Sequence, residues 1–175
     1  MLDPQEFLKI LNKNSVNFFV GVPDSLLKNF CSFIDLNVEN KNHIIAANEG
    51  NAVAIGAGHY IASKQIPLVY MQNSGFGNAI NPLLSLCDKD VYSIPMLLLI
   101  GWRGEPGLND EPQHVKQGSV QQNLFDSIGL VHYTLSTDIK ETDRIITDSV
   151  KSAIKNERPV ALVVRKNTFL QNDYF

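Results

Sequence analysis

The chain has 175 residues, 44% hydrophobic and 19% charged, which is enough apolar material for one core of ordinary domain size. Fifteen basic and 18 acidic residues give a net charge of -3, which argues against a general nucleic-acid binder. The longest apolar run covers residues 95–100, far short of the roughly 20 residues that span a bilayer, and the first residues lack a signal-peptide pattern, so we expect a cytoplasmic protein without membrane segments.

Helical and strand-like segments alternate along the chain. Asp3, Pro4 and Glu6 form a helix-start signal. Apolar and β-branched runs predict strands over 16–20, 43–47, 68–71, 96–100, 131–135 and 160–164. Apolar spacing predicts helices over 25–34, 50–62, 78–86, 121–128 and 142–154. We expect Pro82 to be tolerated only near the start of its helix, and a long polar loop over residues 103–118.

This alternation indicates right-handed βαβ crossovers. It predicts an α/β fold of three layers, a doubly wound, parallel sheet of about six strands with helices on both faces. The apolar strands suit a sheet that is covered on both sides. No internal repeat or linker interrupts the pattern, so residues 1–175 are expected to form a single domain. In such folds ligands bind beyond the carboxyl ends of the strands.

Polar residues gather at four of these predicted strand ends. The four segments are Gly21–Ser25, Asn48–Asn51, Asn73–Asn78 and Gly101–Gly118. After the fifth strand, Ser136–Asp138 is typical of an ordinary helix cap. A purely structural domain would not need this concentration, and we therefore expect a ligand site at this edge of the sheet.

Glu49 follows a predicted strand directly and begins a helix of small residues. A carboxylate is also favoured at a helix N-terminus by the helix dipole, so its position alone leaves a structural role open. Gly56 and Gly58 lie inside this helix, where each glycine costs roughly 1 kcal/mol. Their presence indicates that a ligand or the backbone of a partner packs closely against it.

Two further polar segments leave alternatives open. Gly75 and Gly77 follow a strand, as a ligand loop would, but Ile80 stands where a dinucleotide fingerprint requires Gly or Ala, and a plain tight turn would look the same. Asp24 suits either a ligand site or the cap of the next helix.

Among the four histidines, His114 lies in the predicted loop, and we expect it to contact substrate because loops of this length are usually functional. The other three histidines are expected to be structural. Cys31 and Cys87 are far apart and are expected to be buried free thiols. The spacing of His, Asp and Glu does not predict a metal site held by this chain.

Together these segments resemble a known family. Residues 19–23, 48–54 and 73–78 resemble the pyrimidine-binding (PYR) domain of thiamine diphosphate enzymes, and the resemblance covers essentially the whole chain. Within that superfamily, residues 21–27 and 101–114 are similar to those of phosphonopyruvate decarboxylases. The α subunits of sulfopyruvate decarboxylases are also similar, though less so in the 101–114 segment.

The resemblance implies the thiamine diphosphate-binding fold and a set of site residues. Glu49 matches the glutamate that hydrogen-bonds N1′ of the cofactor's aminopyrimidine, and Asp24 matches a residue expected to handle protons near the reacting carbon. The adjoining cofactor-binding residues would be Gly75, Phe76, Gly77 and Asn78. The implied reaction is the non-oxidative decarboxylation of 3-phosphonopyruvate to phosphonoacetaldehyde and CO2.

A phosphonate substrate carries about two negative charges and needs cations and hydrogen-bond donors. The expected substrate-binding residues are Ser25, Arg103, His114 and Lys116. The acidic residues of the same segment oppose a simple anion clamp, and they either pair with these cations or belong to a loop that orders on binding. These acidic residues are Glu105, Asp110 and Glu111.

One departure from the family pattern concerns the diphosphate. Family members hold Mg²⁺ and the diphosphate with a GDG…N motif in a second domain, and Gly-Asp-Gly does not occur in this sequence. We therefore expect half a cofactor site, completed by a diphosphate-binding (PP) domain or a β subunit in a homo-oligomer, and an isolated chain without activity. The alternatives are a sulfopyruvate decarboxylase α subunit and a non-catalytic, flavodoxin-like nucleotide-binding module.

Overall fold

Six parallel strands form one sheet in the computed structural model, which describes residues 1–170, with the strand order β2-β1-β3-β4-β6-β5. The strands are β1 (Phe19–Gly21), β2 (His43–Ile45), β3 (Leu68–Gln72), β4 (Leu97–Gly101), β5 (Val131–Thr134) and β6 (Val160–Val164). Every neighbouring pair of strands is parallel. The predicted six-stranded parallel sheet is therefore confirmed.

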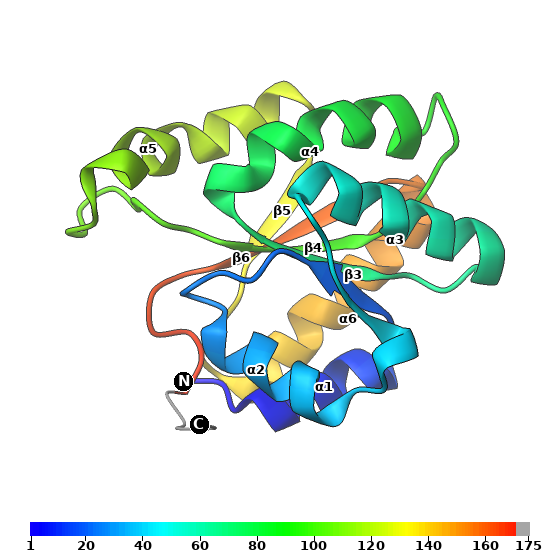
Figure 1. Ribbon diagram of the computed structural model, residues 1–175, viewed down its shortest axis with the longest axis horizontal. Coiled ribbons are helices and arrows are strands. Elements are labelled where there is room, and N and C mark those ends of the chain that lie inside the picture. The colour runs from blue at the N-terminus through cyan, green and yellow to red at the C-terminus, as the bar shows by residue number, and fades with distance from the viewer. Residues whose placement is uncertain (171–175) are drawn as a thin grey trace.

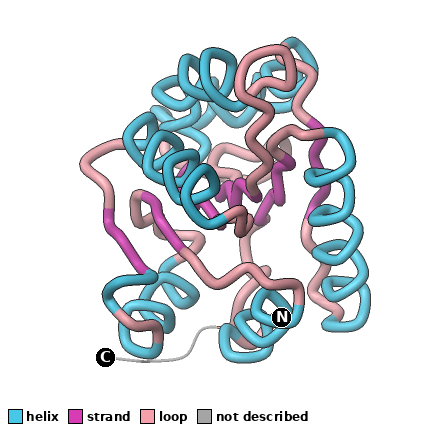
Figure 2. Tube along the Cα trace, turned by 90° about the vertical axis from the view of Figure 1, so that its right-hand side faces the viewer, coloured by secondary structure: helices cyan, strands magenta, loops and turns pink. Residues whose placement is uncertain are grey.

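Helices cover both faces of this sheet (Figure 1; Figure 2 turns the molecule by 90°). They are α1 (Pro4–Lys13), α2 (Lys28–Asn37), α3 (Glu49–Ser63), α4 (Phe76–Pro82), α5 (Pro112–Ser127) and α6 (Ile139–Asn156). Shorter turns are η1 (Asn40–Asn42), η2 (Asn73–Gly75) and the π-helical η3 (Leu83–Cys87). In Figure 1, α1, α2 and α6 lie below the sheet and α3, α4 and α5 above it, so the three-layer prediction is also confirmed.

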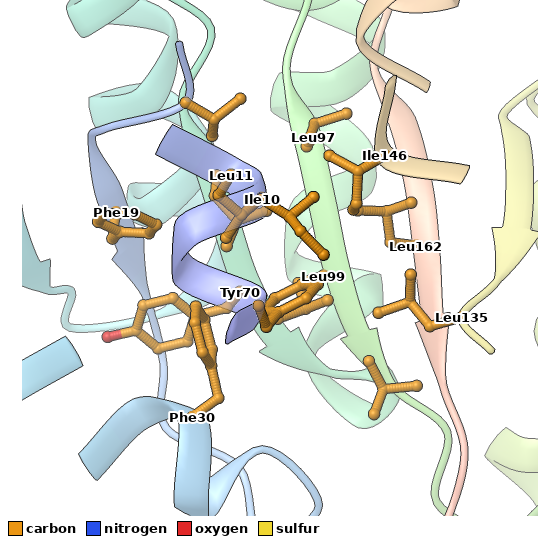
Figure 3. Close-up of a cluster of buried hydrophobic side chains, with 14 of the residues drawn as sticks. Ile10, Leu11, Phe19, Phe30, Tyr70, Leu97, Leu99, Leu135, Ile146 and Leu162 are labelled. Carbon is orange, nitrogen blue, oxygen red and sulfur yellow. The ribbon is translucent and has the colours of Figure 1, made fainter. Parts of the chain in front are cut away.

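Alternate residues of the inner strands supply two separate hydrophobic cores. Leu97 and Leu99 point toward α1, α2 and α6, where they meet side chains such as Ile146 (Figure 3), and Leu98 and Ile100 point toward the opposite layer. All residues of β4 and β6 are buried, as a sheet covered on both faces requires. The predicted apolar character holds less well at the two sheet edges, where Ile45 of β2 is 58% exposed.

The bounds of helix α4 differ from the sequence prediction. Helix α4 begins at Phe76, two residues before the predicted start, and Pro82 is its last residue rather than lying near its start. The wider π-helical turn Leu83–Cys87 follows directly. Proline has no N–H to donate, and a change of helix type at this position accommodates the missing bond.

The polar segment after β4 is also shorter than predicted. Helix α5 begins at Pro112, so residues 112–118 are helical and the connection covers only residues 102–111. Pro112 occupies the first helical position, where its fixed φ and missing N–H are tolerated. His114 and Lys116 therefore stand on the first turns of a helix instead of in a loop.

The remaining histidines and the cysteines have the structural roles expected of them. His43 Nε2 lies 2.8 Å from the Tyr70 hydroxyl, and the His59 ring stacks on Phe18 at a centroid distance of 4.0 Å. Both cysteines are buried free thiols, and burial raises their pKa to about 12. None of the helices among residues 1–170 combines the length and apolar character needed to cross a membrane.

Candidate functional site

Glu49 lies at the carboxyl edge of the sheet. It is the first residue of α3, the helix that follows β2. The side chain of Asn48 accepts a hydrogen bond from the Asn51 N–H at 2.9 Å and so caps the helix. This cap fixes the first turn of α3, and with it the position from which the Glu49 side chain extends.

The carboxyl group of Glu49 rests directly on Gly75. A Cβ at position 75 would lie 2.1 Å from Glu49 Oε1, and Asn78 Nδ2 donates to Oε2 at 2.9 Å. Oε1 receives no hydrogen bond from any residue between 1 and 170. We call Glu49, Gly75 and Asn78 the glutamate cradle: a half-buried carboxyl group, fixed through one oxygen, with the other oxygen open to a ligand.

Phe76, the residue after Gly75, connects the cradle to the hydrophobic core. Its ring is buried and packs edge-on against Phe125 at a centroid distance of 4.9 Å. The ring therefore belongs to the core, and Phe76 could meet a cofactor only through its main chain. Gly77 is exposed, and a Cβ there would have no neighbour within 4 Å.

Asp24 is almost fully buried, at 5% exposure, and it belongs to the same edge. Its Oδ1 accepts from Gln72 Nε2 at 2.7 Å, and Oδ2 accepts from the Leu26 N–H at 3.1 Å. Because α2 begins only at Lys28, Asp24 does not cap that helix but closes the turn before it. A Cβ at Gly101 would lie 2.1 Å from Asp24 Oδ2, so the site requires glycine there.

A short series of hydrogen bonds links Asp24 to the glutamate cradle. Gln72 donates to Asp24, its Oε1 accepts from Ser74 Oγ at 2.5 Å, and Ser74 precedes Gly75. The predicted residues at the ends of β1 and β3 therefore form one connected site.

Arg103 joins three strand ends. Its Nε and NH2 donate to both oxygens of Asp110, and its NH1 donates to Ser25 Oγ at 2.7 Å. Its backbone N–H and carbonyl bond the side chain of Asn73 at 3.2 and 2.8 Å. Asp110 also accepts from the Gly104 N–H at 2.7 Å. The carboxylate thus holds the arginine in place and closes the 102–111 connection on itself.

The expected substrate-binding residues do not all come together. Ser25 and Arg103 line one pocket, together with Lys166. Lys116 is exposed on α5 and does not line that pocket. His114 is half-buried, its carbonyl packs against Gly104, and its Nδ1 has no hydrogen-bond partner among the described residues. Of the four expected substrate-binding residues, the structure thus brings Ser25 and Arg103 together and leaves Lys116 apart from them.

Sequence reasoning missed three polar residues of this edge. Gln72 is the last residue of β3, and Arg165 and Lys166 directly follow β6, which pairs with β4. The same rule that found Glu49, a polar residue at the carboxyl end of a parallel strand, would have found this pair. Arg165 is ion-paired with the buried Glu105, and Lys166 lines the pocket beside Arg103.

The donor set fits the pyrimidine end of thiamine diphosphate. A carboxyl group with one open oxygen, set on a glycine that allows close approach, suits a ring nitrogen. Among residues 1–170, no group of three or more His, Cys, Asp or Glu side chains could hold a metal ion.

The Arg103–Asp110 pair makes stability depend on pH. Hydrogen bonds from Arg103 hold the pKa of Asp110 well below its ordinary value. A lowered folded-state pKa stabilises the fold above the unfolded value of about 4, and this contribution is lost as pH falls toward the folded value. Asp110→Asn should therefore lower the free energy of unfolding by about 1 kcal/mol at pH 7. Urea unfolding at pH 7 and pH 3 should show this difference shrinking at pH 3, and an equal difference at both pH values would contradict it.

Comparison with known proteins agrees with this geometry. The family model of the thiamine pyrophosphate enzymes' N-terminal TPP binding domain matches residues 5–130, and the chain belongs to this family. The solved structure of a 4-hydroxybenzoylformate decarboxylase from Rhodococcus jostii has the same fold, with a TM-score of 0.68 at 18% identity, covering 94% of this chain and 30% of that one.

Curated relatives divide into two groups. The chain is 34% identical to phosphonopyruvate decarboxylase of Streptomyces hygroscopicus over 71% of its own length, but it spans only 30% of that protein. It is also 34% identical to the sulfopyruvate decarboxylase subunit alpha of Methanocaldococcus jannaschii, over 87% of both chains. The sequence thus corresponds to less than a third of one relative's length and to nearly all of the other's.

Proposed function

We propose that this chain supplies the pyrimidine-binding half of a thiamine diphosphate-dependent 2-oxo acid decarboxylase. The complete enzyme would convert 3-phosphonopyruvate to phosphonoacetaldehyde and CO2. The observation that carries the proposal is the glutamate cradle, in which Glu49 lies on Gly75 and keeps Oε1 open at the carboxyl edge of the sheet. Membership of the thiamine pyrophosphate enzyme family supports it.

Each residue of the edge has a defined task in this proposal. Glu49 Oε1 would hold the ring nitrogen N1′ and the proton shared with it, and the lack of a side chain at Gly75 would allow the ring to approach. Asp24, buried and oriented by Gln72, would move a proton near the reacting carbon. When bound, thiamine diphosphate supplies the electron sink that lets the substrate carboxyl group leave as CO2.

The diphosphate end and Mg²⁺ require a partner. We propose that a PP domain or β subunit supplies them, because Gly-Asp-Gly is absent from the sequence. Relatives that this chain matches over most of their length are named subunit alpha, which supports such a partner. The isolated chain would then lack activity and bind the cofactor at most weakly, and calorimetry that found sub-micromolar binding would contradict this.

The exposed face of α3 is the surface that suits this partner. Exposed residues at helical spacing on α3 are small or apolar and include Ala54, Gly58 and Ile61, the last at 57% exposure. A Cβ at Gly58 would have no neighbour, whereas Gly56 faces inward and allows α3 to pack against Val69 of β3. The stripe begins beside Glu49, so a partner covering it would also close the cofactor site.

Replacing Ala54 by Arg on this face should prevent assembly without unfolding the chain. A charged, bulky side chain would be buried without a partner charge, so we expect at least a tenfold weaker association with the diphosphate-binding partner, on the order of 2 kcal/mol. Size-exclusion chromatography of the assembled enzyme measures this, with Asn12→Arg on exposed α1 as the matched control. Unchanged assembly of the Ala54 variant would place the interface elsewhere.

Sulfopyruvate is the second candidate substrate, because relatives of both kinds match at similar identity. Steady-state kinetics of the complete enzyme with 3-phosphonopyruvate and with sulfopyruvate distinguishes the two. We further propose a cytoplasmic homo-oligomer, and the two buried free thiols are consistent with a reducing compartment. The family match disfavours the non-catalytic nucleotide-binding module.

A further inference from the structure

A pocket of about 290 Å³ opens beside Arg103 at the carboxyl edge of the sheet. Its walls come from three strand ends, with Ser25 after β1, the 102–110 connection after β4, and Lys166 after β6. Ser25 adjoins Asp24, whose hydrogen bonds to Gln72 lead on to the glutamate cradle. The pocket and the cradle therefore lie on one connected edge.

The charges around this pocket leave one cation without a partner. Arg103 is engaged by Asp110, and Arg165 is engaged by Glu105. Lys166 lines the pocket, is exposed, and has no carboxylate partner among residues 1–170. The two acidic residues that line the pocket are Asp110 and Glu105. Each is already paired with an arginine and does not pair with Lys166. An anionic group could therefore bind between Lys166 and the Arg103 guanidinium, beside the Ser25 hydroxyl, which accepts from Arg103 at 2.7 Å and donates to Asp24 at 3.5 Å.

Glu105 also lines the pocket and has unused hydrogen-bonding capacity. It is 7% exposed, and Arg165 binds its Oε1. Its Oε2 is buried and receives no hydrogen bond from any described residue. Buried polar atoms are rarely left without a partner, and a carboxylate oxygen can be satisfied only by a donor. Oε2 itself has no accessible surface, so a ligand that carries an O–H group would supply that donor after the Glu105 side chain turns toward the pocket.

This acceptor distinguishes the two candidate substrates by their chemistry. Phosphoryl groups lose their second proton near neutral pH, so part of the phosphonate is a monoanion that has one O–H group and two oxygens sharing one negative charge. A sulfonate carries a single charge and has no proton to donate at this pH. Its oxygens would face the Glu105 carboxylate with repulsion instead of a hydrogen bond.

We propose that this pocket receives the acidic tail of the substrate, with Lys166 as its cation and Glu105 as the acceptor that selects a hydrogen phosphonate over a sulfonate. The inference rests on the proposed function, since it takes a 3-substituted pyruvate as the substrate. It assigns the tail to Ser25, Arg103 and Lys166, in place of the expected Lys116.

Two variants of the complete enzyme test the assignment. Glu105→Gln should lower the preference for 3-phosphonopyruvate over sulfopyruvate, measured as the ratio of kcat/KM values, by roughly tenfold or more, because an amide N–H can donate to a sulfonate oxygen. Lys166→Met should raise KM for both substrates about tenfold with little change in kcat, as expected for lost uniform binding. Lys151→Met, on exposed α6, is the matched control. Unchanged preference in a Glu105 variant of normal melting temperature would overturn the selection by Glu105.

Binding of tail analogues separates this inference from the proposed function. Calorimetry of the complete enzyme with 3-phosphonopropanoate and 3-sulfopropanoate, which lack the keto group, reports on the pocket alone. We expect the phosphonate to bind more tightly, and Lys166→Met to weaken both. If the wild type decarboxylates neither pyruvate, the proposed function fails, and these titrations still decide the pocket. Equal binding by the wild type and the Lys166 variant would overturn it.

Discussion

Replacing Glu49 by Gln should lower kcat of the complete enzyme by roughly 10²–10⁴-fold, the range typical of losing one proton-handling group. Gln keeps the size of the side chain and its contact with Asn78, but its amide cannot share a proton with a ring nitrogen as a carboxyl group does. Single-turnover decarboxylation by the assembled enzyme measures the effect. A rate within threefold of the wild type would remove Glu49 from the chemistry.

The conservative nature of this change makes its control simple. Glu141→Gln on α6 makes the same chemical substitution at an exposed position. Both variants should unfold at the wild-type temperature, because Glu49 is half-exposed and bonded through only one oxygen. If both variants lost activity equally, the loss at Glu49 would reflect assembly or stability rather than proton transfer.

Gly75→Ala should be nearly as damaging, although it adds only one methyl group. The new Cβ would lie 2.1 Å from Glu49 Oε1, so the carboxyl group must leave its position. Backbone strain is not the cause, since φ of −82° suits alanine. Displacing a catalytic group by about 1 Å can cost on the order of 10²-fold in rate, and we expect a loss of that size. Decarboxylation kinetics measures it.

A second glycine in the same layer provides the contrast. Gly58→Ala meets no atom within 4 Å, and alanine is favoured over glycine in a helix by about 1 kcal/mol, so this variant should be more stable than the wild type. Urea unfolding compares the two variants. A Gly75→Ala variant that kept full activity would show that Glu49 can act from another position, which would weaken the proposed role of the cradle.

The sheet was predictable because its information is local. Runs such as Val160–Val164 are apolar throughout and bounded by turn residues, and the observed β6 has the predicted bounds. The predicted bounds of a helix or loop differ from the structure where one residue type is compatible with both. Pro112 could close a loop or open a helix, and the polar residues after it carry little helical periodicity. That ambiguity extended the predicted loop over the first turns of α5.

The sequence predicts those site residues that follow a strand, because each is recognised from its own segment alone. Glu49 and Asp24 each lie in the segment that follows a strand, and the rule for parallel sheets placed them at one edge. Their partners could not be inferred, because pairing across the fold depends on strand order: Gly101 meets Asp24 only because their two strands flank β3. The Glu105–Arg165 pair likewise depends on β4 lying beside β6.

The two ends of the described chain are joined by backbone hydrogen bonds. The Leu2 N–H donates to Thr168 O at 2.7 Å, and the Leu170 N–H donates to Leu2 O at 2.8 Å, so the first and last segments run side by side. A short peptide linker could therefore connect them, and new termini could be opened in the exposed turn around Asp90, distant in sequence from every site residue. Such a circular permutant should keep this fold, because the linker would join two segments that already lie side by side.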